Sequence, residues 1–513
     1  MSDLWELPQA WRWTDMGEIA NIIGGGTPST NDSDNFDGDI PWITPADLSG
    51  YKEKFINKGA RNITDSGYQR SGAKWLPKGT ILFSSRAPIG YVAIASCPIT
   101  TNQGFKSFVP LNGINSEYVY YWLSSSKKRA EELASGTTFL EISGAKASLI
   151  PFPLSPTNEQ TRIVEKLEEL LSDLDAGVAE LKAAQKKLAL YRQSLLKAAV
   201  EGVLTAEWRK HNTPTETGAQ LLERILTERR ARWEAKQLAK FEEQGKTPPQ
   251  DWQKKYPEPV QPDITNLLEL PEGWVWASLD MLGEIVSGIA KGMKRASNVL
   301  VREVAYLRVA NVQRGYLDLT EVKSIFATER EITELTLQDG DVLFNEGGDR
   351  DKLGRGWVWR NEVVDCIHQN HVFRMRAYAN EMQSELISHH GNTFGKLWFQ
   401  NAGKQTTNLA SINMNMLRVF PVPVAPAVEQ VEIIEQIQAQ LESLTDQECA
   451  IELALKQSAA QRQNILRAAF SGQLVPQDPN DEPAIVLLER IRAEREAQAA
   501  DKKPRGRKAK DAV

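Results

Sequence analysis

Side chains able to contact nucleic acid gather at loop positions in both halves of this 513-residue chain. Arginine reads guanine edges, asparagine and glutamine read adenine edges, and serine, threonine and lysine hold phosphates. Loop residues of these types are Ser85, Arg86, Thr101, Asn102 and Gln103 in the first half, and Arg308, Asn311, Gln313, Arg350, Lys404, Gln405 and Asn408 in the second. They are candidate DNA contacts, although surface exposure and turn formation also explain residues of these types in loops.

Catalytic and metal-binding patterns are weak by comparison. His368 with His371, and His389 with His390, are possible metal-binding pairs. Glu346, Asp349 and Asp351 are the residues of a possible acidic nuclease site. No supporting cluster of cysteine or histidine accompanies them, so surface or hydrogen-bonded histidines and a solvated turn are favoured. The sequence contains no Asn-Pro-Pro-aromatic or Asp-Pro-Pro-aromatic methyltransferase motif and no GxxxxGK phosphate loop. We predict neither a catalytic residue nor a metal site.

A long helix that occurs twice is predicted to position the loops. The stretch from Pro156 to Gly202 reappears as Pro426 to Gly472 at a constant offset, because 429 − 159 = 270 and 472 − 202 = 270. Apolar residues step by four and three through both copies, which is typical of helices that wind around a partner helix. Each copy should form a helix of about 45 residues, roughly 65–70 Å long. We expect the two copies to pair antiparallel with each other; an arm that dimerises two chains is the alternative.

The seam of this pair follows from the same periodicity. The residues expected to form the helix pair and a partner interface are Leu167, Leu171, Leu174, Leu181, Leu188, Arg192, Leu195, Ile437, Leu441, Leu444, Ile451, Leu455, Arg462 and Ile465. Polar residues interrupt the apolar pattern at Gln185, Arg192, Glu448, Ser458 and Arg462. Polar seam positions usually specify register or accept further helices from a partner.

The segments around the long helices are also repeated. The opening at 7–13 returns at 270–276, and Leu221-Leu222-Glu223-Arg224-Ile225 returns as Leu487-Leu488-Glu489-Arg490-Ile491. Between these repeated segments the two copies share little sequence. We therefore expect a common framework that carries two domains with different loops and surfaces. Local patterns predict strands at 40–44, 79–83 and 91–94, a mobile glycine-rich loop at 24–30, a helix at 116–133 and a charged helix at 218–243.

The predicted fold class is α+β, with two similar mixed α/β domains separated by two long antiparallel coiled-coil helices in an internal pseudo-twofold repeat. The mixed domains are expected at 1–155 and 269–425, and the long helices, acting as spacers, at 156–212 and 426–478. The remaining segments are a charged helix with a Pro-rich connection at 213–268 and a charged helix with a basic tail at 479–513.

Composition bears on the compartment more than on the function. The hydrophobic content of 41% and charged content of 25% are ordinary for globular proteins. No apolar run approaches the ~20 residues of a membrane helix, and no signal peptide opens the chain, so we expect a cytoplasmic protein. Cys97, Cys366 and Cys449 lie too far apart in the sequence to indicate a disulfide framework. The net charge of −6 argues against nucleic-acid binding, but an acidic scaffold can hide a local basic face.

Two unlike domains on a stiff spacer suit the reading of two short DNA segments across an unread gap. The chain resembles, over nearly its whole length, the specificity subunits of type I restriction-modification systems. The resemblance rests on motifs in duplicated order: the openings at 7–13 and 270–276, the segments Gly24–Pro28 and Ile40–Ile43, the Pro-x-x-Glu-Gln entries at Pro156 and Pro426, and the helix ends Arg192–Leu196 and Arg462–Leu466.

This resemblance implies that 1–155 and 269–425 are target recognition domains for a bipartite, gapped and asymmetric double-stranded DNA target. It implies no chemistry and no cofactor in this prokaryotic chain. Two modification subunits would use S-adenosylmethionine to methylate adenine at N6, and translocating restriction subunits would join them. The Pro-rich connection and basic tail are long for the family. Residues 504–507 resemble a minor-groove hook, with a disordered end as the alternative.

Two other functions stay open from the residues alone. One is a helical adaptor that binds only proteins. The other is a self-contained nuclease or methyltransferase, which the missing motifs disfavour.

Overall fold

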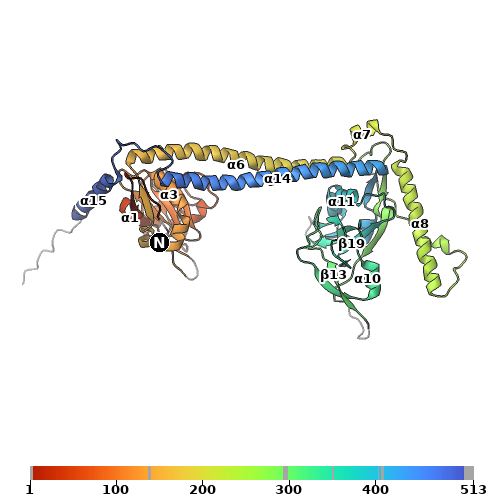
Figure 1. Ribbon diagram of the computed structural model, residues 1–513. Helices are drawn as coiled ribbons and strands as arrows, with labels where there is room; N and C mark the ends of the chain where they lie inside the picture. The colour runs from red at the N-terminus through yellow and green to blue at the C-terminus, as the bar shows by residue number, and fades with distance from the viewer. Residues whose placement is uncertain are drawn as a thin grey trace, which may run out of the picture. The chain divides into compact units, whose positions relative to one another are not determined.

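The computed structural model describes residues 4–136, 140–292, 299–348, 352–402, 404–405 and 410–501. The chain forms two units: unit 1 comprises residues 1–182 and 452–513, and unit 2 comprises residues 183–451. Both long helices cross this division, because α6 (Thr157–Val200) and α14 (Ala427–Phe470) are continuous over 44 residues each (Figure 1). The predicted length of the two helices is confirmed. None of the helices that the structure describes is long and apolar enough to span a membrane.

Unit 1 combines short strands with helices that vary widely in length. Its strands are β1 (Arg12–Asp15), β2 (Ala20–Gly24), β3 (Phe36–Ile40), β4 (Trp42–Ile43), β5 (Phe55–Ile56), β6 (Ile81–Ser85), β7 (Ile89–Ala95), β8 (Thr100–Thr101), β9 (Lys106–Pro110) and β10 (Pro151–Leu154). Besides its parts of α6 and α14, its helices are α1 (Met16–Ile19), α2 (Asp65–Gln69), α3 (Ser116–Ser125), α4 (Lys127–Leu133), α5 (Gly144–Ala147) and α15 (Ala484–Asp501).

Unit 2 has the same mixture of elements. Its strands are β11 (Val275–Ser278), β12 (Gly283–Ser287), β13 (Arg302–Leu307), β14 (Lys323–Ala327), β15 (Val342–Asn345), β16 (Gly347–Gly348), β17 (Gly356–Val358), β18 (Ile367–His368), β19 (Val372–Ala377), β20 (Lys404–Gln405), β21 (Ala410–Ser411) and β22 (Pro421–Val424). Its other helices are α7 (Ala206–His211), α8 (Gly218–Glu243), α9 (Leu279–Leu282), α10 (Glu329–Leu335), α11 (Ser384–Asn392), α12 (Phe394–Ala402) and α13 (Met414–Arg418).

The two units share one strand frame. The order β2-β9-β6-β7 in unit 1 matches the order β12-β19-β15-β17 in unit 2, and the pair β1–β10 matches β11–β22. The register agrees as well, since Trp13 pairs with Pro153 as Trp276 pairs with Pro423. The fillings differ, because unit 1 adds β5 and a β4–β8 pair while unit 2 adds a β14-β13-β18 sheet. The α+β class and the repeated frame are therefore confirmed.

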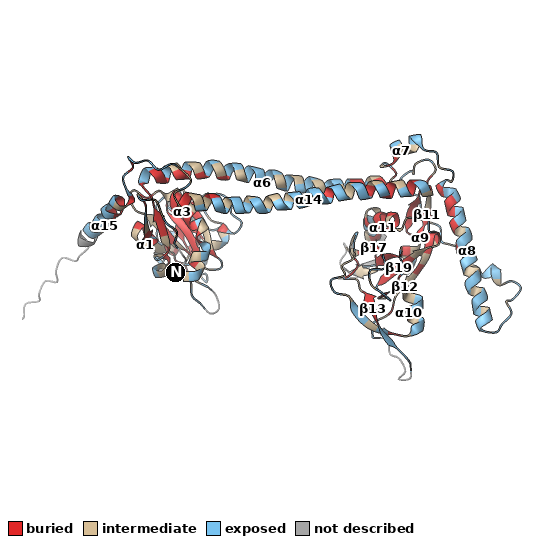
Figure 2. Ribbon diagram, in the orientation of Figure 1, coloured by how far each residue is buried: buried red, intermediate tan, exposed pale blue. Residues whose placement is uncertain are grey.

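The two charged helices exchange places relative to the sequence repeat. Helix α8 follows α6 in the chain but joins the core of unit 2, through Leu221, Leu222 and Ile225. Helix α15 follows α14 but joins the core of unit 1, through Leu487, Leu488 and Ile491. Figure 2 shows the buried start of α8 in red and its exposed continuation in blue. Each unit therefore combines one mixed domain with the charged helix that follows the other mixed domain in the sequence.

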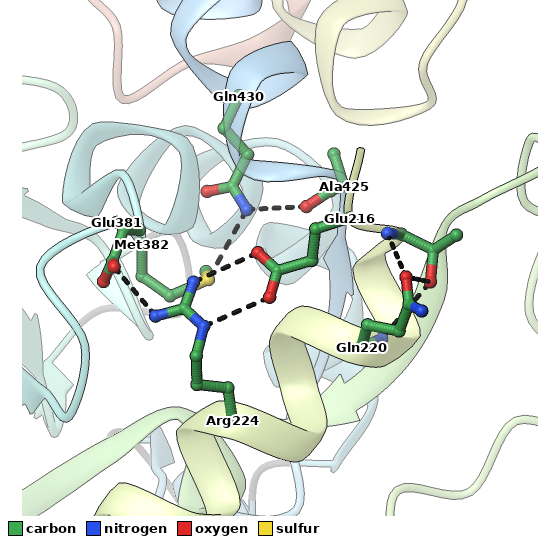
Figure 3. Close-up of polar contacts among 8 residues, drawn as sticks. Glu216, Gln220, Arg224, Glu381, Met382, Ala425 and Gln430 are labelled. Atoms are coloured by element: carbon green, nitrogen blue, oxygen red, sulfur yellow. Dashed lines mark hydrogen bonds and ion pairs between the residues drawn. The ribbon is translucent and has the colours of Figure 1, made fainter. Parts of the chain in front are cut away.

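Ion pairs hold the start of α8 in unit 2, as Figure 3 shows. Arg224 reaches Glu216 at 3.1 Å and Glu381 at 2.8 Å. In unit 1, Arg490 pairs with Glu482 at 2.5 Å, which repeats the Arg224–Glu216 pair eight residues apart. These exposed pairs orient the helix and add little to stability.

A buried glutamate near the start of each long helix bonds a tryptophan that precedes the first strand of the mixed domain in the same unit. Trp11 Nε1 donates to Glu159 at 2.8 Å in unit 1, and Trp274 Nε1 donates to Glu429 at 2.9 Å in unit 2. Both carboxylates are at most 1% exposed. The repeated Trp and Glu of the sequence motifs are therefore partners in space.

The glutamine that follows each glutamate closes a second link. Gln430 Nε2 donates to Ala425 O at 2.8 Å (Figure 3). Gln430 Oε1 accepts from Gln383 N at 3.0 Å. Gln160 makes the matching bonds in unit 1, to Ser155 O at 3.0 Å and from Asn115 N at 2.8 Å. Each glutamine thus ties the strand before the long helix to the N-terminus of α3 or α11.

The seam of the helix pair is antiparallel in each unit. Arg462 bonds Asp175 in unit 1, and Arg192 Nη2 lies 2.9 Å from Glu448 Oε2 in unit 2. Six of the predicted seam residues are buried, namely Leu167, Leu171, Leu195, Ile437, Leu444 and Ile465. The other predicted seam residues are half-buried, namely Leu174, Leu181, Leu188, Arg192, Leu441, Ile451, Leu455 and Arg462.

Two local predictions were wrong. Gln185 is exposed and Ala184 takes the half-buried position, because the apolar repeat shifts by one residue there. The helix expected at 116–133 divides into α3 and α4, because Ser126 N bonds Leu123 O and its hydroxyl bonds Trp122 O at 2.7 Å.

Candidate nucleic-acid interface

The glycine-rich loop of unit 1 is clamped against the segment that holds three of the candidate residues. Gly26 N donates to Thr101 O at 2.9 Å, and the Thr27 hydroxyl donates to the side chain of Gln103. A Cβ atom on Gly25 would lie 2.2 Å from Thr101 O, so only glycine fits there. The prediction of a mobile loop is therefore wrong, since the glycines permit close packing of two backbones.

The candidate segment after β8 is only partly open to a ligand. Thr101 is 1% exposed and pairs with Ile43 of β4. Asn102 Oδ1 accepts from Gly104 N at 2.9 Å, so this amide builds the turn. Gln103 is exposed. Gln103 is thus the member of this segment whose side chain lies at the surface.

Strand β6 delivers two more candidates to the same turn. Ser85 is fully buried, and its hydroxyl donates to Gly104 O at 3.0 Å, which makes it a structural residue. Every residue of β6 is buried, and Arg86 is the first side chain after it that reaches solvent. Arg86 is therefore placed to meet a ligand.

Glu141 lies between two cations beside this turn. Its Oε2 is 3.5 Å from Arg86 Nη1, and its Oε1 is 3.4 Å from Lys106 Nζ. The side chains of Arg86 and Glu141 are each 38% exposed, while that of Lys106 is 17% exposed. Lys106 Nζ also lies 3.4 Å from Gln103 O, which joins these charges to the turn. Two cations against one carboxylate leave a local excess of positive charge in an acidic chain.

Unit 2 places candidates at the matching point of its frame. Ile142 N donates to Ser85 O at 3.0 Å in unit 1, and Ile412 N donates to Glu346 O at 2.8 Å in unit 2. The next residues form a small sheet in which β16 pairs with β21 and β21 pairs with β20. The backbone thus brings together Gly347 and Gly348 with the candidates Lys404 and Gln405. The side chains of these two candidates are not among those described.

The three candidates in the loop after β13 all form bonds within that loop. Asn311 is 3% exposed, accepts from Arg308 N at 2.9 Å and donates to Glu321 O at 2.9 Å. Arg308 pairs with the carboxylate of Glu321 at 3.3 Å. Gln313 is half-buried, and its Nε2 donates to Ala310 O at 2.7 Å. Asn311 is therefore a structural residue, and the amide of Gln313 also bonds within the loop.

Two of the three buried histidines have backbone partners for their rings. His368 Nδ1 lies 2.6 Å from Val372 O, and His390 Nε2 lies 2.8 Å from Pro421 O. Burial lowers the pKa of His368, His389 and His390 to about 4, so these rings are neutral at pH 7. Within the described residues, no group of three or more His, Cys, Asp or Glu side chains is arranged to hold a metal ion.

The acidic loop of unit 2 is described only in part. Glu346 Oε2 lies 2.5 Å from His371 Nδ1. The remaining predicted residues, which are Asp349, Arg350, Asp351 and Asn408, lie outside the described residues.

Sequence reasoning missed three residues of the unit 1 cluster. Thr27 and Lys106 are phosphate-binding types. Thr27 lies in the glycine-rich loop at 24–30 and meets Gln103 only in the fold, and Lys106 follows Gln103 by three residues, inside strand β9. Glu141 gave no signal, because an acidic residue argues against a DNA contact when it is considered alone. Its position just before Ile142, which matches Ile412, is the signal that the strand frame provides.

Comparison with known proteins places this geometry in context. The family model of the type I restriction modification DNA specificity domain matches residues 8–183. The MjaIX specificity subunit of Methanocaldococcus jannaschii is 42% identical over 169 residues, which are 32% of this chain and 39% of that protein. The EcoKI specificity subunit of Escherichia coli is 22% identical over 525 residues, with 98% of both chains covered.

Solved structures share the fold. The HsdS subunit from Thermoanaerobacter tengcongensis matches with a TM-score of 0.52 at 14% identity, over 91% of this chain and 98% of that one. A chain from a type I R-M system, solved to explain complex assembly and conformational transition, matches with a TM-score of 0.60 at 16% identity, over 92% of this chain and 100% of that one.

Proposed function

This chain belongs to the specificity subunits of type I restriction-modification enzymes, and we propose that it recognises a bipartite, gapped and asymmetric DNA target. As a specificity subunit it is the non-catalytic member of its complex. The relatives named above are all restriction-enzyme subunits, so the protein-only adaptor is not retained.

One observation carries this proposal: the same frame is built twice with different residues at its candidate interface. The turn after β6 presents Arg86, Gln103 and Lys106, whereas the matching place after β15 presents Gly347 and the β20–β21 pair. Surfaces that differ in side chains read different base sequences. Two unlike readers in one chain support a target of two different halves.

The partners and cofactor follow from family membership. We propose that two modification subunits bind this chain and use S-adenosylmethionine to methylate adenine at N6. Restriction subunits that translocate DNA are proposed to join the same complex. The half-buried polar residues of the helix seam support docking of further helices there. We propose the cytoplasm of a prokaryotic cell as the compartment, since the DNA target is there.

Methylome sequencing of cells with and without this gene tests the function. We expect a gapped, two-part motif with N6-methyladenine in each half, which disappears when the gene is deleted. An unchanged methylome in cells that express all the partner subunits contradicts the proposal. Exchanging residues 1–155 with those of a relative should change one half of the motif and leave the other half intact.

A further inference from the structure

The charges around Glu141 are not needed to build the strand frame. Arg86 and Glu141 form an antiparallel bridge in unit 1, and Gly347 and Ser411 form the matching bridge in unit 2. Unit 2 completes the bridge with no charged side chain at either position. An ion pair that the fold does without requires another explanation.

The geometry of these ion pairs is loose. The distances from Glu141 to Arg86 and Lys106 are 3.5 Å and 3.4 Å, longer than the 2.7–2.9 Å that is typical of charge-assisted hydrogen bonds. The two partners that form the bridge are each 38% exposed. Loose and partly exposed pairs contribute little to stability and exchange readily for other partners.

We propose that Glu141 is a specificity-determining residue, which holds Arg86 and Lys106 away from the phosphates of arbitrary double-stranded DNA. This inference rests on the proposed function and assigns a role within the same interface. The Glu141 carboxylate repels a phosphate and competes with it for both cations. It accepts hydrogen bonds from base amino groups, so contact with base edges is not penalised in the same way.

The consequence is a bias against backbone-only binding. Phosphate contacts supply essentially all of the affinity for arbitrary DNA, and each one contributes about 0.9 to the slope of log affinity against log salt. Glu141 withholds up to two such contacts in unit 1. Unit 2 has no acid at the matching position, so the restraint belongs to one half of the reader.

The test measures binding of the purified full-length chain to a duplex of arbitrary sequence over a salt series, by fluorescence anisotropy. We expect E141Q to bind this duplex roughly 3- to 10-fold more tightly at low salt, with a slope steeper by about 0.9–1.8. The matched control is E131Q, which removes the same charge from an exposed pair with Lys127 at 3.8 Å in the same unit. We expect E131Q to leave the slope unchanged.

Two further variants make the result decisive. E141S copies Ser411 of unit 2 and should reproduce the gain of E141Q, even if glutamine disturbs the local packing. Adding R86A to E141Q should remove part of the gain. Equal slopes for wild type and both Glu141 variants overturn the inference while the proposed function stands. Failure of the wild-type chain to bind any duplex, together with an unchanged methylome, refutes the proposed function itself.

Discussion

The buried glutamates at the start of the long helices offer a matched pair of substitutions, E429Q in unit 2 and E159Q in unit 1. Glu429 accepts hydrogen bonds from Thr205 Oγ1 at 2.7 Å, from Arg209 Nη2 at 2.6 Å and from Trp274 Nε1 at 2.9 Å. Glutamine has nearly the same size, so each substitution removes the charge and keeps the shape. Both glutamates accept from a tryptophan, but Glu429 also faces Thr205 and the cation Arg209, whereas Glu159 faces Gln477.

In unit 2, E429Q leaves Arg209 without its ion-pair partner. Breaking a buried ion pair costs about 3–5 kcal/mol. The Arg209 side chain keeps 20% exposure and a hydrogen bond to Gly202 O at 2.7 Å, so the lower end of that range applies. We expect E429Q to lower the free energy of unfolding of unit 2 by about 3 kcal/mol.

In unit 1, Glu159 has neutral hydrogen-bond partners in Trp11 and Gln477. Burial raises the pKa of Glu159 above its ordinary value of 4.5. A raised pKa in the folded state means that stability is present at low pH and is lost as pH rises from 4.5 through the raised value. E159Q removes that loss, so we expect a change of about 0–1 kcal/mol at pH 7 and a weaker pH dependence.

Hydrogen exchange of the full-length variants, followed peptide by peptide, resolves the two units. Peptides from β11 and β22 should exchange faster in E429Q, while peptides from β1 and β10 should change little in E159Q. R209M in the E429Q background should recover part of the loss, because it removes the unpaired cation. Equal losses in E429Q and E159Q would refute the role assigned to Arg209.

Three further expectations address the interface. G25A should lower the melting temperature of unit 1 and reduce methylation specificity in one half of the motif, because its Cβ would lie 2.2 Å from Thr101 O. G24A is the control, since a Cβ there has nothing within 4 Å and should leave the melting temperature unchanged. Thermal unfolding of both variants measures the difference. N102A with Q103A should relax sequence preference in one half of the methylated motif, and equal relaxation of both halves would count against the assignment. Deleting residues 504–513 should make the negative slope of log affinity against log salt shallower by about 0.9 for each phosphate that the tail neutralises. An unchanged slope would contradict the interpretation of residues 504–507 as a minor-groove hook.

Patterns that are local and repeated predicted the structure well. The constant offset and heptad spacing gave both long helices within one or two residues of their observed ends, and the charged helix at 218–243 matches α8. Such helices depend on their own periodicity and caps, so neighbouring sequence is enough to find them.

Features that depend on distant partners were not predictable in the same way. Gly25 looked like a flexible turn, because the strand that it packs against lies more than seventy residues later. Ser85 and Asn311 are residue types that bind DNA, but both are buried and bond to the protein's own backbone. The exchange of α8 and α15 between units also escaped detection, because an apolar face does not specify which core it joins.

The division of unit 1 into two distant chain segments sets the order in which a nascent chain can complete its parts. Unit 2 is continuous, so all its residues have left the ribosome before α15 is made. Unit 1 begins first but must wait for Phe470, which packs on Tyr118 and Trp122. Until Phe470 is synthesised, the apolar surface around Tyr118 and Trp122 stays exposed. The N-terminal part of the chain is therefore the part most open to chaperones and proteases during synthesis.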